Sequence, residues 1–409
     1  MTECSDTAAL RAEGAPAETG AVPPWLVILS LAMGGFAIGT TEFAAMALVP
    51  NFAAALGVTE ARAADAISAY ALGVVVGAPT LAVLGARMSR RMLLVWLMLA
   101  FGVFNVASAM APDFRTMLIF RFLSGLPHGA YFGVAALVAA SVVPLRQRSS
   151  AVARVMVGLT VATTIGVPTA SVLGQTLGWR WGFGIVGLLA AATAVAVYLL
   201  APRDGPAPGA NPLRELSALK SRQVWLTLAT GAIGFGGFFA VYTYLSSTLL
   251  LTMGEAEWTV PAMLMLAGLG MTCFTLLFGW AADRNQSLAG FASLGCGAVI
   301  MAIYPSATGS LWTLAPVVFL FAITGGLSTV LQTRLMDVAG EAQQLAAALN
   351  HAAFNAANAL GPFLAAQAVA AGYGFPASGY VGAGLSVAGI AVFAITLWDA
   401  RRHPETAAR

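Results

Sequence analysis

The stretch TMLIFRFLSGLPHGAYFGVAALVAA, residues 116–140, decides the fold. Apart from Arg121 and His128 it is apolar or small, and it exceeds the roughly 20 residues that a helix needs to cross a lipid bilayer. Similar runs recur along the chain, which is 59% hydrophobic and only 9% charged, whereas soluble proteins carry about a quarter charged residues. The sequence therefore predicts an all-α membrane protein, because in lipid a helix satisfies its own backbone amides.

Apolar runs between turn signals predict twelve transmembrane helices. The polar interval 202–223 is rich in Pro, Gly and Asn, and is expected to be a cytoplasmic linker between two six-helix halves, 25–201 and 224–398. Residues 1–24 and 399–409 are expected to be cytoplasmic tails, the first disordered. The predicted spans are 25–49, 63–84, 92–111, 116–140, 152–176, 181–201, 224–251, 260–281, 288–306, 311–333, 345–370 and 377–398.

The positions of Arg and Lys predict how these helices insert. With the N-terminus inside, sixteen of them fall in cytoplasmic segments, among them Arg334, and only Arg62, Arg115 and Arg180 fall in outer loops. Arg121 is the one that remains within a span. By the positive-inside rule we expect both termini in the cytoplasm.

An offset of 194 residues relates the two halves. Several matches at equivalent places in the topology predict pseudo-symmetric halves with a cavity between them near the middle of the bilayer. The matched pairs are Gly85 and Gly279, Ser89 and Asp283, Arg90 and Arg284, and Pro168 and Pro362.

Two residues of opposite charge lie within the predicted spans, Glu42 in the first and Arg121 in the fourth. Burying either one costs at least about 2.5 kcal/mol, so each is expected to face the interior of the bundle. From the outer surface Glu42 lies roughly 12 Å deep and Arg121 roughly 8 Å deep, which allows them to pair. Such a pair holds helices together or takes part in proton transfer, and both interpretations stay open.

His128 lies seven residues after Arg121, on nearly the same helix face and roughly 10 Å deeper. A neutral imidazole there joins helices by a hydrogen bond, or relays protons. Gly125, Gly129 and Gly133 form a ridge that lets another helix approach closely.

Polar side chains within the spans are candidates for substrate binding, because amides and hydroxyls beside aromatic rings suit an amphipathic guest. The polar stripe around His351 either joins helices or contacts substrate. The predicted spans of the C-terminal half contain no charge, which disfavours a strongly charged substrate. The candidates are Tyr70, Asn105, Tyr131, Tyr242, Tyr244, Gln332, Asn350, Asn355 and Asn358.

Several classes of protein are disfavoured. The net charge of +3 is scattered over short loops, which is not typical of a nucleic-acid-binding protein. Cys4, Cys273 and Cys296 have no metal-binding spacing and are expected to be free thiols. There is no HExxH motif, nucleophile motif or nucleotide-phosphate loop, so we expect no enzyme, no metal and no cofactor.

Five stretches together resemble the major facilitator superfamily, specifically its drug/proton antiporter branch and the bacterial arabinose efflux permease-type exporters. The resemblance covers nearly the whole chain and implies the major facilitator fold of twelve helices. The stretches are GTTEF (39–43), ISAYALGVVVGAP (67–79), RFLSGLPHGAYFGV (121–134), GVPTASVLGQTLGWRWGF (166–183) and NPLRELSALKS (211–221).

The resemblance also implies roles for single residues. Arg121 matches a fourth-helix arginine implicated in proton coupling, and Glu42 matches a first-helix acid of antiporters. Ser89 stands where the family has an aspartate to which a cytoplasmic gating contact is attributed, whereas Asp283 is retained in the second half. Gly158, Gly166, Pro168 and Gly174 resemble the fifth-helix antiporter motif of the family, with a wider spacing. The remaining predicted gating or packing positions are Gly125, Gly129, Gly166, Pro168, Gly279 and Arg284.

The resulting hypothesis is a monomeric secondary transporter of a bacterial inner membrane. It would export a small organic compound, such as a sugar, a nucleoside or a drug, in exchange for protons. Glu42 would alternate between a charged form attracted to Arg121 and a protonated form favoured by low dielectric. His128 is a possible second proton carrier. A proton-coupled uptake symporter and a receptor that does not transport remain the alternatives.

Overall fold

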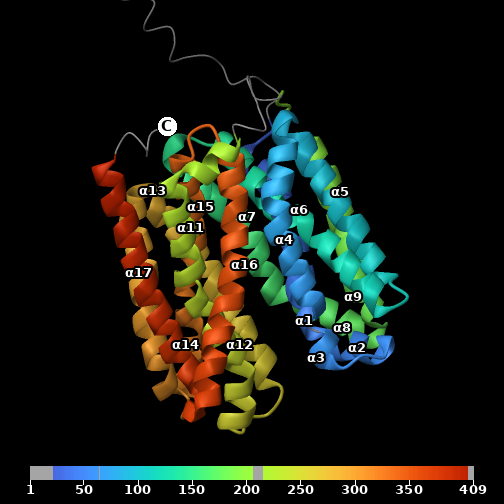
Figure 1. Ribbon diagram of the computed structural model, residues 1–409. Coiled ribbons are helices and arrows are strands. Elements are labelled where there is room, and N and C mark those ends of the chain that lie inside the picture. Colours follow the sequence, from blue (N-terminus) through green and yellow to red (C-terminus); the bar gives the residue numbers. More distant parts are fainter. Residues whose placement is uncertain (1–21, 64, 206–214, 404–409) are drawn as a thin grey trace, which may run out of the picture.

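The computed structural model describes residues 22–63, 65–205 and 215–403. Residues 1–21 of the predicted disordered tail, which include Cys4, the middle of the predicted linker and the last residues of the C-terminal tail lie outside these. Pro24, the last residue of the predicted tail, opens the first helix. The described chain is helical, and its helices run nearly parallel to one another along a tall bundle (Figure 1). The thiols of Cys273 and Cys296 are free.

Six membrane-length helical segments form the first half of the bundle. Short helices α2 (Val49–Leu56) and α3 (Glu60–Ala63) lie at the end of the bundle opposite the C-terminus (Figure 1). The fifth segment contains a π-helical turn, Ala162–Gly166, before Pro168. The six segments are α1 (Pro24–Ala47), α4 (Asp65–Leu84), α5 (Arg90–Ala109), α6 (Phe114–Ser141), α7 (Arg148–Val161) with α8 (Val167–Thr176), and α9 (Trp179–Leu200).

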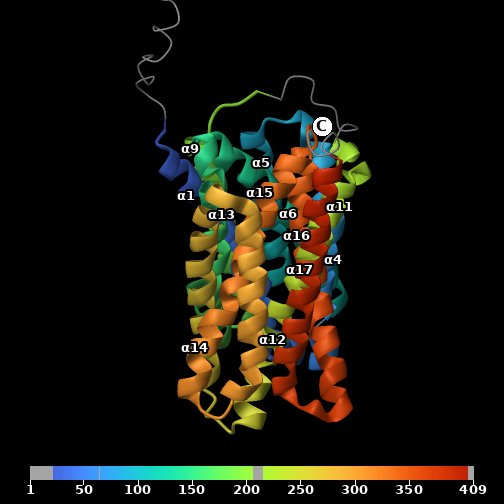
Figure 2. The same ribbon diagram turned by 90° about the vertical axis from the view of Figure 1, so that its left-hand side faces the viewer.

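The second half repeats this pattern. Helix α13 (Thr259–Ala307) bends at Asn285, whose backbone is not helical, into two antiparallel arms (Figure 2). The other segments are α11 (Arg222–Gly234) with α12 (Gly236–Ser247), α14 (Leu311–Phe321) with α15 (Gly326–Val338), α16 (Gln343–Ala368), and α17 (Ser378–Arg402).

Ten helical stretches of the described residues are long and apolar enough to cross a membrane. The bent helix α13 is one of these and crosses twice, and the more polar α16 also runs along the bundle (Figure 1). The described chain therefore makes twelve crossings, and the predicted fold class is confirmed.

Each half has a core of its own. In the N-terminal bundle, the helices from α1 to α9, buried side chains such as Leu31, Phe101 and Phe132 pack together. In the C-terminal bundle, the helices from α11 to α17, Phe238 and Phe321 belong to a second cluster. Because most apolar burial lies within a bundle, the two bundles can shift relative to each other without exposing either core.

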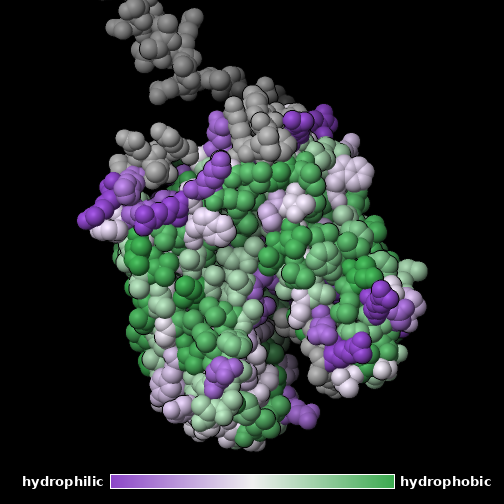
Figure 3. Space-filling model, viewed as in Figure 1, coloured by the Kyte–Doolittle hydropathy of each residue, from purple (hydrophilic) through white to green (hydrophobic). Residues whose placement is uncertain are grey.

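The bundles touch at one end and separate at the other. At the end that carries the C-terminus, the glycine ridge of α6 meets α16: a Cβ at Gly133 would lie 2.7 Å from the backbone N of Ala348. At the same end, Gly279 of α13 packs on Ala153 of α7. Figure 3 shows the opposite end hollowed between the bundles.

Two predictions about charge are wrong: that Arg334 lies in a loop, and that the C-terminal half buries no charge. Arg334, expected in a loop, is only 8% exposed, and Asp399 is only 2% exposed, so the C-terminal bundle does hold buried charges. Helices α15 and α17 extend beyond the predicted spans and carry these residues into the bundle. Gln223 joins them, since it accepts a hydrogen bond from Arg334 Nη2 (3.0 Å) and donates one to Asp399 Oδ2 (2.8 Å).

Candidate functional site

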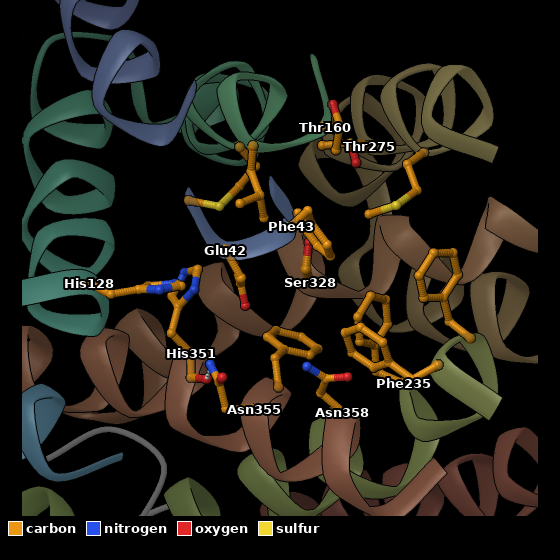
Figure 4. A pocket seen from close by; sticks show the side chains of 16 residues that line it. Glu42, Phe43, His128, Thr160, Phe235, Thr275, Ser328, His351, Asn355 and Asn358 are labelled. Carbon is orange, nitrogen blue, oxygen red and sulfur yellow. Dashed lines mark hydrogen bonds between the residues drawn. The ribbon is translucent and has the colours of Figure 1, made fainter. Parts of the chain in front are cut away.

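A cavity with an empty volume of about 660 Å³ lies between the two bundles (Figure 4). Helices α1, α6 and α7 form one wall, and α12, α13, α15 and α16 form the other. Most of its surface is apolar and aromatic, which is typical of a small-molecule site. Its chemically distinctive side chains are Glu42, Phe43, His128, Phe235, Phe238, Phe239, His351, Phe354, Asn355 and Asn358.

Glu42 provides the only carboxylate among the residues that line this cavity. Its side chain points from α1 into the open space (Figure 4). In the described part of the chain, no side chain forms a hydrogen bond or an ion pair with it. An unpaired carboxylate in a mostly apolar cavity is expensive to keep charged, so this position favours exchange of a proton or of a bound ligand.

Arg121 lies behind the cavity wall and is fully buried. Its Nη1 donates to the hydroxyl of Thr41 (3.1 Å), which donates to Asn105 Oδ1 (2.6 Å). The guanidinium carbon lies 4.4 Å from the ring centre of Tyr70 and 5.3 Å from that of Phe183. Within the described residues, Arg121 Nε and Nη2 have no hydrogen-bond partner.

The predicted ion pair between Glu42 and Arg121 is not formed in this conformation. Consecutive residues of a helix point about 100° apart, so α1 turns Thr41 toward Arg121 and Glu42 toward the cavity. The two charges still interact electrostatically at longer range.

Two imidazoles meet where the bundles join. A hydrogen bond of 2.9 Å connects the Tyr70 hydroxyl to His128 Nδ1. The ring of His128 lies 5.3 Å from that of His351 of the other bundle, and His351 stacks on Phe132 at 4.2 Å. Because His351 Nε2 has no partner within the described chain, it is available to a ligand or a proton.

Of the nine predicted substrate-binding residues, Asn355 and Asn358 line the cavity. The Oδ1 atom of Asn355 has no partner in the described chain, so it is free to accept a hydrogen bond. Tyr70 and Asn105 instead surround Arg121, as described above. Substrate contact by the asparagines stays a prediction.

The other five predicted residues lie outside the cavity lining. The Tyr131 hydroxyl donates to the backbone O of Leu31. Two of them bond to each other, with Asn350 donating to Gln332. Tyr242 stacks on Phe238, and Tyr244 stacks on Phe375.

Sequence reasoning missed the phenylalanines of the cavity. Phe235, Phe238 and Phe239 come from the stretch GFGGFF, residues 234–239, and Phe354 faces them from α16 at 4.7 Å from Phe235. The glycines between the rings were a signal, but an apolar side chain in a membrane span can face either the lipid or the bundle interior. Only the packing of α12 against α16 shows that these rings face inward.

Asp283 fastens the bundles together at the closed end. Its carboxylate accepts hydrogen bonds from the backbone N of Ser149 (2.8 Å) and Ser150 (3.1 Å), at the start of α7, and from the Ser150 hydroxyl. The next residue, Arg284, stacks on Trp280. Arg148, the first residue of α7, forms an ion pair with Asp337 of α15 at 3.3 Å.

The other predicted packing positions lie at close helix contacts. Gly125 packs on the backbone of Tyr70 and Gly73, and Gly129 packs on Ala78 and Ala348. Gly166 meets the Thr40 hydroxyl of α1, and Pro168 lies in the first turn of α8. A larger side chain at these glycines would push the helices apart.

Comparison with known proteins gives one consistent result. Residues 31–347 match the family model described as Major Facilitator Superfamily. The inner membrane transport protein YdhP of Escherichia coli (strain K12) is 39% identical over 381 residues, which cover 93% of this chain and 97% of that protein. The chloramphenicol resistance protein of Streptomyces lividans is 33% identical over 349 residues, which cover 83% of this chain and 88% of that protein.

A solved structure shows the same fold. The proton:xylose symporter XylE, bound to 6-bromo-6-deoxy-D-glucose, superposes with a TM-score of 0.71 over 92% of this chain and 95% of that chain, at 15% identity.

Proposed function

Because this chain belongs to the major facilitator superfamily, we propose that it exports a small organic compound across a bacterial inner membrane in exchange for protons. The chain is a multi-pass secondary transporter and not an enzyme. Export, proton coupling and the class of substrate are the proposed parts, within the drug/proton antiporter branch that its motifs resemble.

The position of Glu42 carries the proposal. Its carboxylate lies in the cavity, one residue from the Thr41 hydroxyl that binds Arg121. Two buried donors of Arg121, Nε and Nη2, have no partner in the described chain. When Glu42 loses its proton, its negative charge is attracted to these donors; when it gains one, the neutral acid is stable in the apolar cavity. Protonation thus decides whether α1 is drawn toward α6.

The shape of the bundle supports alternating access. The cavity is closed where Asp283 holds the start of α7 and where Gly133 meets Ala348. If the positive-inside prediction is correct, that end is cytoplasmic and the conformation faces outward. An outward-facing exporter would release its substrate and take up a proton at Glu42.

The cavity lining suits an amphipathic substrate of modest polarity. Phenylalanines supply a large apolar surface, while Asn355, Asn358 and His351 offer hydrogen bonds. We propose a sugar, a nucleoside or a drug-like molecule; the resistance protein of Streptomyces lividans is named for chloramphenicol. The protein would act as a monomer and needs no cofactor.

Transport in sealed vesicles tests this function. A growth-inhibition screen of an expressing strain against sugars, nucleosides and antibiotics would first supply a substrate. Purified protein in vesicles with an imposed pH gradient should then move this compound against the direction of proton flow. Movement in the same direction as protons would make the protein a symporter, and binding without movement would make it a receptor; either result contradicts the proposal.

A further inference from the structure

The pseudo-symmetry of the two halves leaves one gating contact unaccounted for. In the second half, Asp283 accepts hydrogen bonds from the start of α7. The offset of 194 residues places Ser89 at the equivalent position of the first half, and residues 343 and 344 at the positions equivalent to Ser149 and Ser150. The Ser89 hydroxyl instead accepts from the backbone N of Met92 in its own helix, α5 (3.3 Å). Ser89 therefore does not bond to the start of α16 as Asp283 bonds to the start of α7, and another residue has to supply that acceptor.

A carboxylate from the segment between the halves occupies this place. Glu215 Oε2 accepts a hydrogen bond from the backbone N of Leu345 (2.9 Å), in the first turn of α16. An acceptor at a helix N-terminus satisfies an otherwise unpaired amide, and its negative charge opposes the positive end of the helix dipole. These are the interactions that Asp283 makes with α7.

The surroundings of Glu215 place it between the two bundles. Burial raises the pKa of its carboxyl, while the Leu345 amide and the positive charge of Arg90, at the start of α5, act in the opposite direction. Glu215 thus contacts α16, and the charge of Arg90 in the other bundle acts on its carboxyl.

The short helix that follows, Leu216–Lys220, packs against α16 and α11. Its Ala218 is only 1% exposed and packs in one cluster with Ala82 of α4 and Leu345 of α16. Next to it, Gln344 Nε2 donates to the backbone O of Ala82 (2.7 Å), so α16 and α4 also meet directly. When the bundles separate at this end, these contacts have to break.

We propose that Glu215 is a latch of the closed end: it replaces the aspartate that is missing at Ser89 and holds the start of α16 against the N-terminal bundle. Residues 215–220 are then a working part of the gate. This inference rests on the alternating access proposed above. A cap that merely stabilised α16 would act equally in both conformations and would not change their ratio.

Distances between spin labels measure this ratio without substrate or a proton gradient. Labels at Arg87 and Arg401, exposed residues near the closed ends of α4 and α17, would be introduced after Cys4, Cys273 and Cys296 are changed to Ser. Pulsed electron resonance in lipid nanodiscs then separates closed molecules, with short distances, from open molecules, with longer ones.

Glu215→Ala should raise the ratio of long to short distances about fivefold, the shift expected from loss of one N-terminal cap. Lys220→Ala, which removes an exposed charge from the same short helix, should leave the ratio unchanged. Adding Ser89→Asp to Glu215→Ala should bring the ratio back toward the parent value. If Glu215→Ala does not fold, Glu215→Gln, which keeps the volume and an acceptor oxygen, should show a smaller rise.

An unchanged ratio in Glu215→Ala, or an equal rise in Lys220→Ala, would overturn the latch. Failure of Ser89→Asp to restore the ratio would overturn the replacement of the missing aspartate. Because no transport is measured, these results leave the proposed transport function to its own test.

Discussion

Arg121 is buried in this conformation without a carboxylate partner, and one hydroxyl, that of Thr41, binds its guanidinium. The ring of Tyr70 at 4.4 Å offsets part of the cost of burial, because a cation over an aromatic face contributes on the order of 1–2 kcal/mol when water is absent. An arginine held this loosely is ready to accept a second partner. Glu42 is the nearest candidate, since it follows Thr41 on α1.

Thr41→Val tests how much this hydroxyl contributes. Valine has the same shape but leaves Arg121 Nη1 and Asn105 Oδ1 without their shared partner, so we expect a loss of about 1–3 kcal/mol in the free energy of unfolding. The measurement is denaturant unfolding in lipid micelles. Thr169→Val is the matched control, because the Thr169 hydroxyl is exposed and bonds only to its own helix. Equal stability of the two variants would contradict this account of Arg121.

The sequence located the intramembrane charges but not their partners. Glu42, Arg121 and His128 were visible because ionisable residues are rare in apolar runs. Whether Glu42 or Thr41 faces Arg121 depends on the rotation of α1 about its axis, which a depth estimate does not contain. For the same reason Asn105 and Tyr70, predicted to bind substrate, lie around Arg121.

Helix α6 connects the two bundles by packing on α16. Gly125 packs on α4 of its own bundle, Gly129 packs on both α4 and α16, and Gly133 packs on α16 of the other bundle. His128 lies between these contacts and touches His351. The absence of side chains along this face lets the backbones meet and close one end of the cavity.

A larger residue at Gly133 should open that end. The Cβ of Gly133→Val would lie within 2.7 Å of the backbone N of Ala348, and such overpacking costs about 1–3 kcal/mol in the closed state. The distances between spin labels at Arg87 and Arg401, measured by pulsed electron resonance, should therefore include a larger share of the long distances of the open state. Gly184→Val is the control, because nothing lies within 4 Å of a Cβ there. The same distances in both variants would show that this contact does not hold the closed end.

The N-terminal cap of α6 predicts a dependence on pH. Asp113 accepts a hydrogen bond from the backbone N of Thr116 (2.9 Å), and this bond lowers the pKa of the Asp113 carboxyl below 3.8. Because the pKa of Asp113 is lower in the folded state than in the unfolded state, the charged cap stabilises the protein at pH values above the unfolded pKa. This stabilisation is lost as the pH falls through the folded pKa. The melting temperature of Asp113→Asn should therefore differ from that of the wild type at neutral pH. The two melting temperatures should converge below about pH 4. A constant difference across this range would contradict the cap.

The elements themselves were largely predictable, because an apolar run of bilayer length has few alternatives to a helix. What local pattern did not show were departures from straight helices. Examples are the bend at Asn285, the π-helical turn before Pro168, and the extension of α15 that buries Arg334. These depend on neighbours from distant parts of the chain, such as Gln223 beside Arg334.

At the scale of the whole molecule, the two bundles form a cavity that is closed at one end only. The closing contacts between the bundles are polar or involve small side chains: Asp283 at α7, Gln344 at α4, and glycines and alanines between the helices. Contacts of this kind exchange readily for water, whereas most members of the two largest apolar clusters belong to a single bundle. This division allows rocking of the bundles around a central site.

Proton coupling through Glu42 is the central claim, and Glu42→Gln in sealed vesicles tests it most directly. With the substrate from the screen, the variant should lose transport driven by a pH gradient but keep exchange of labelled for unlabelled substrate, because exchange needs the moving bundles and no proton. Glu257→Gln, which neutralises an exposed carboxylate outside the helices, is the matched control and should behave as wild type. Gradient-driven transport by Glu42→Gln at the wild-type rate would contradict the account.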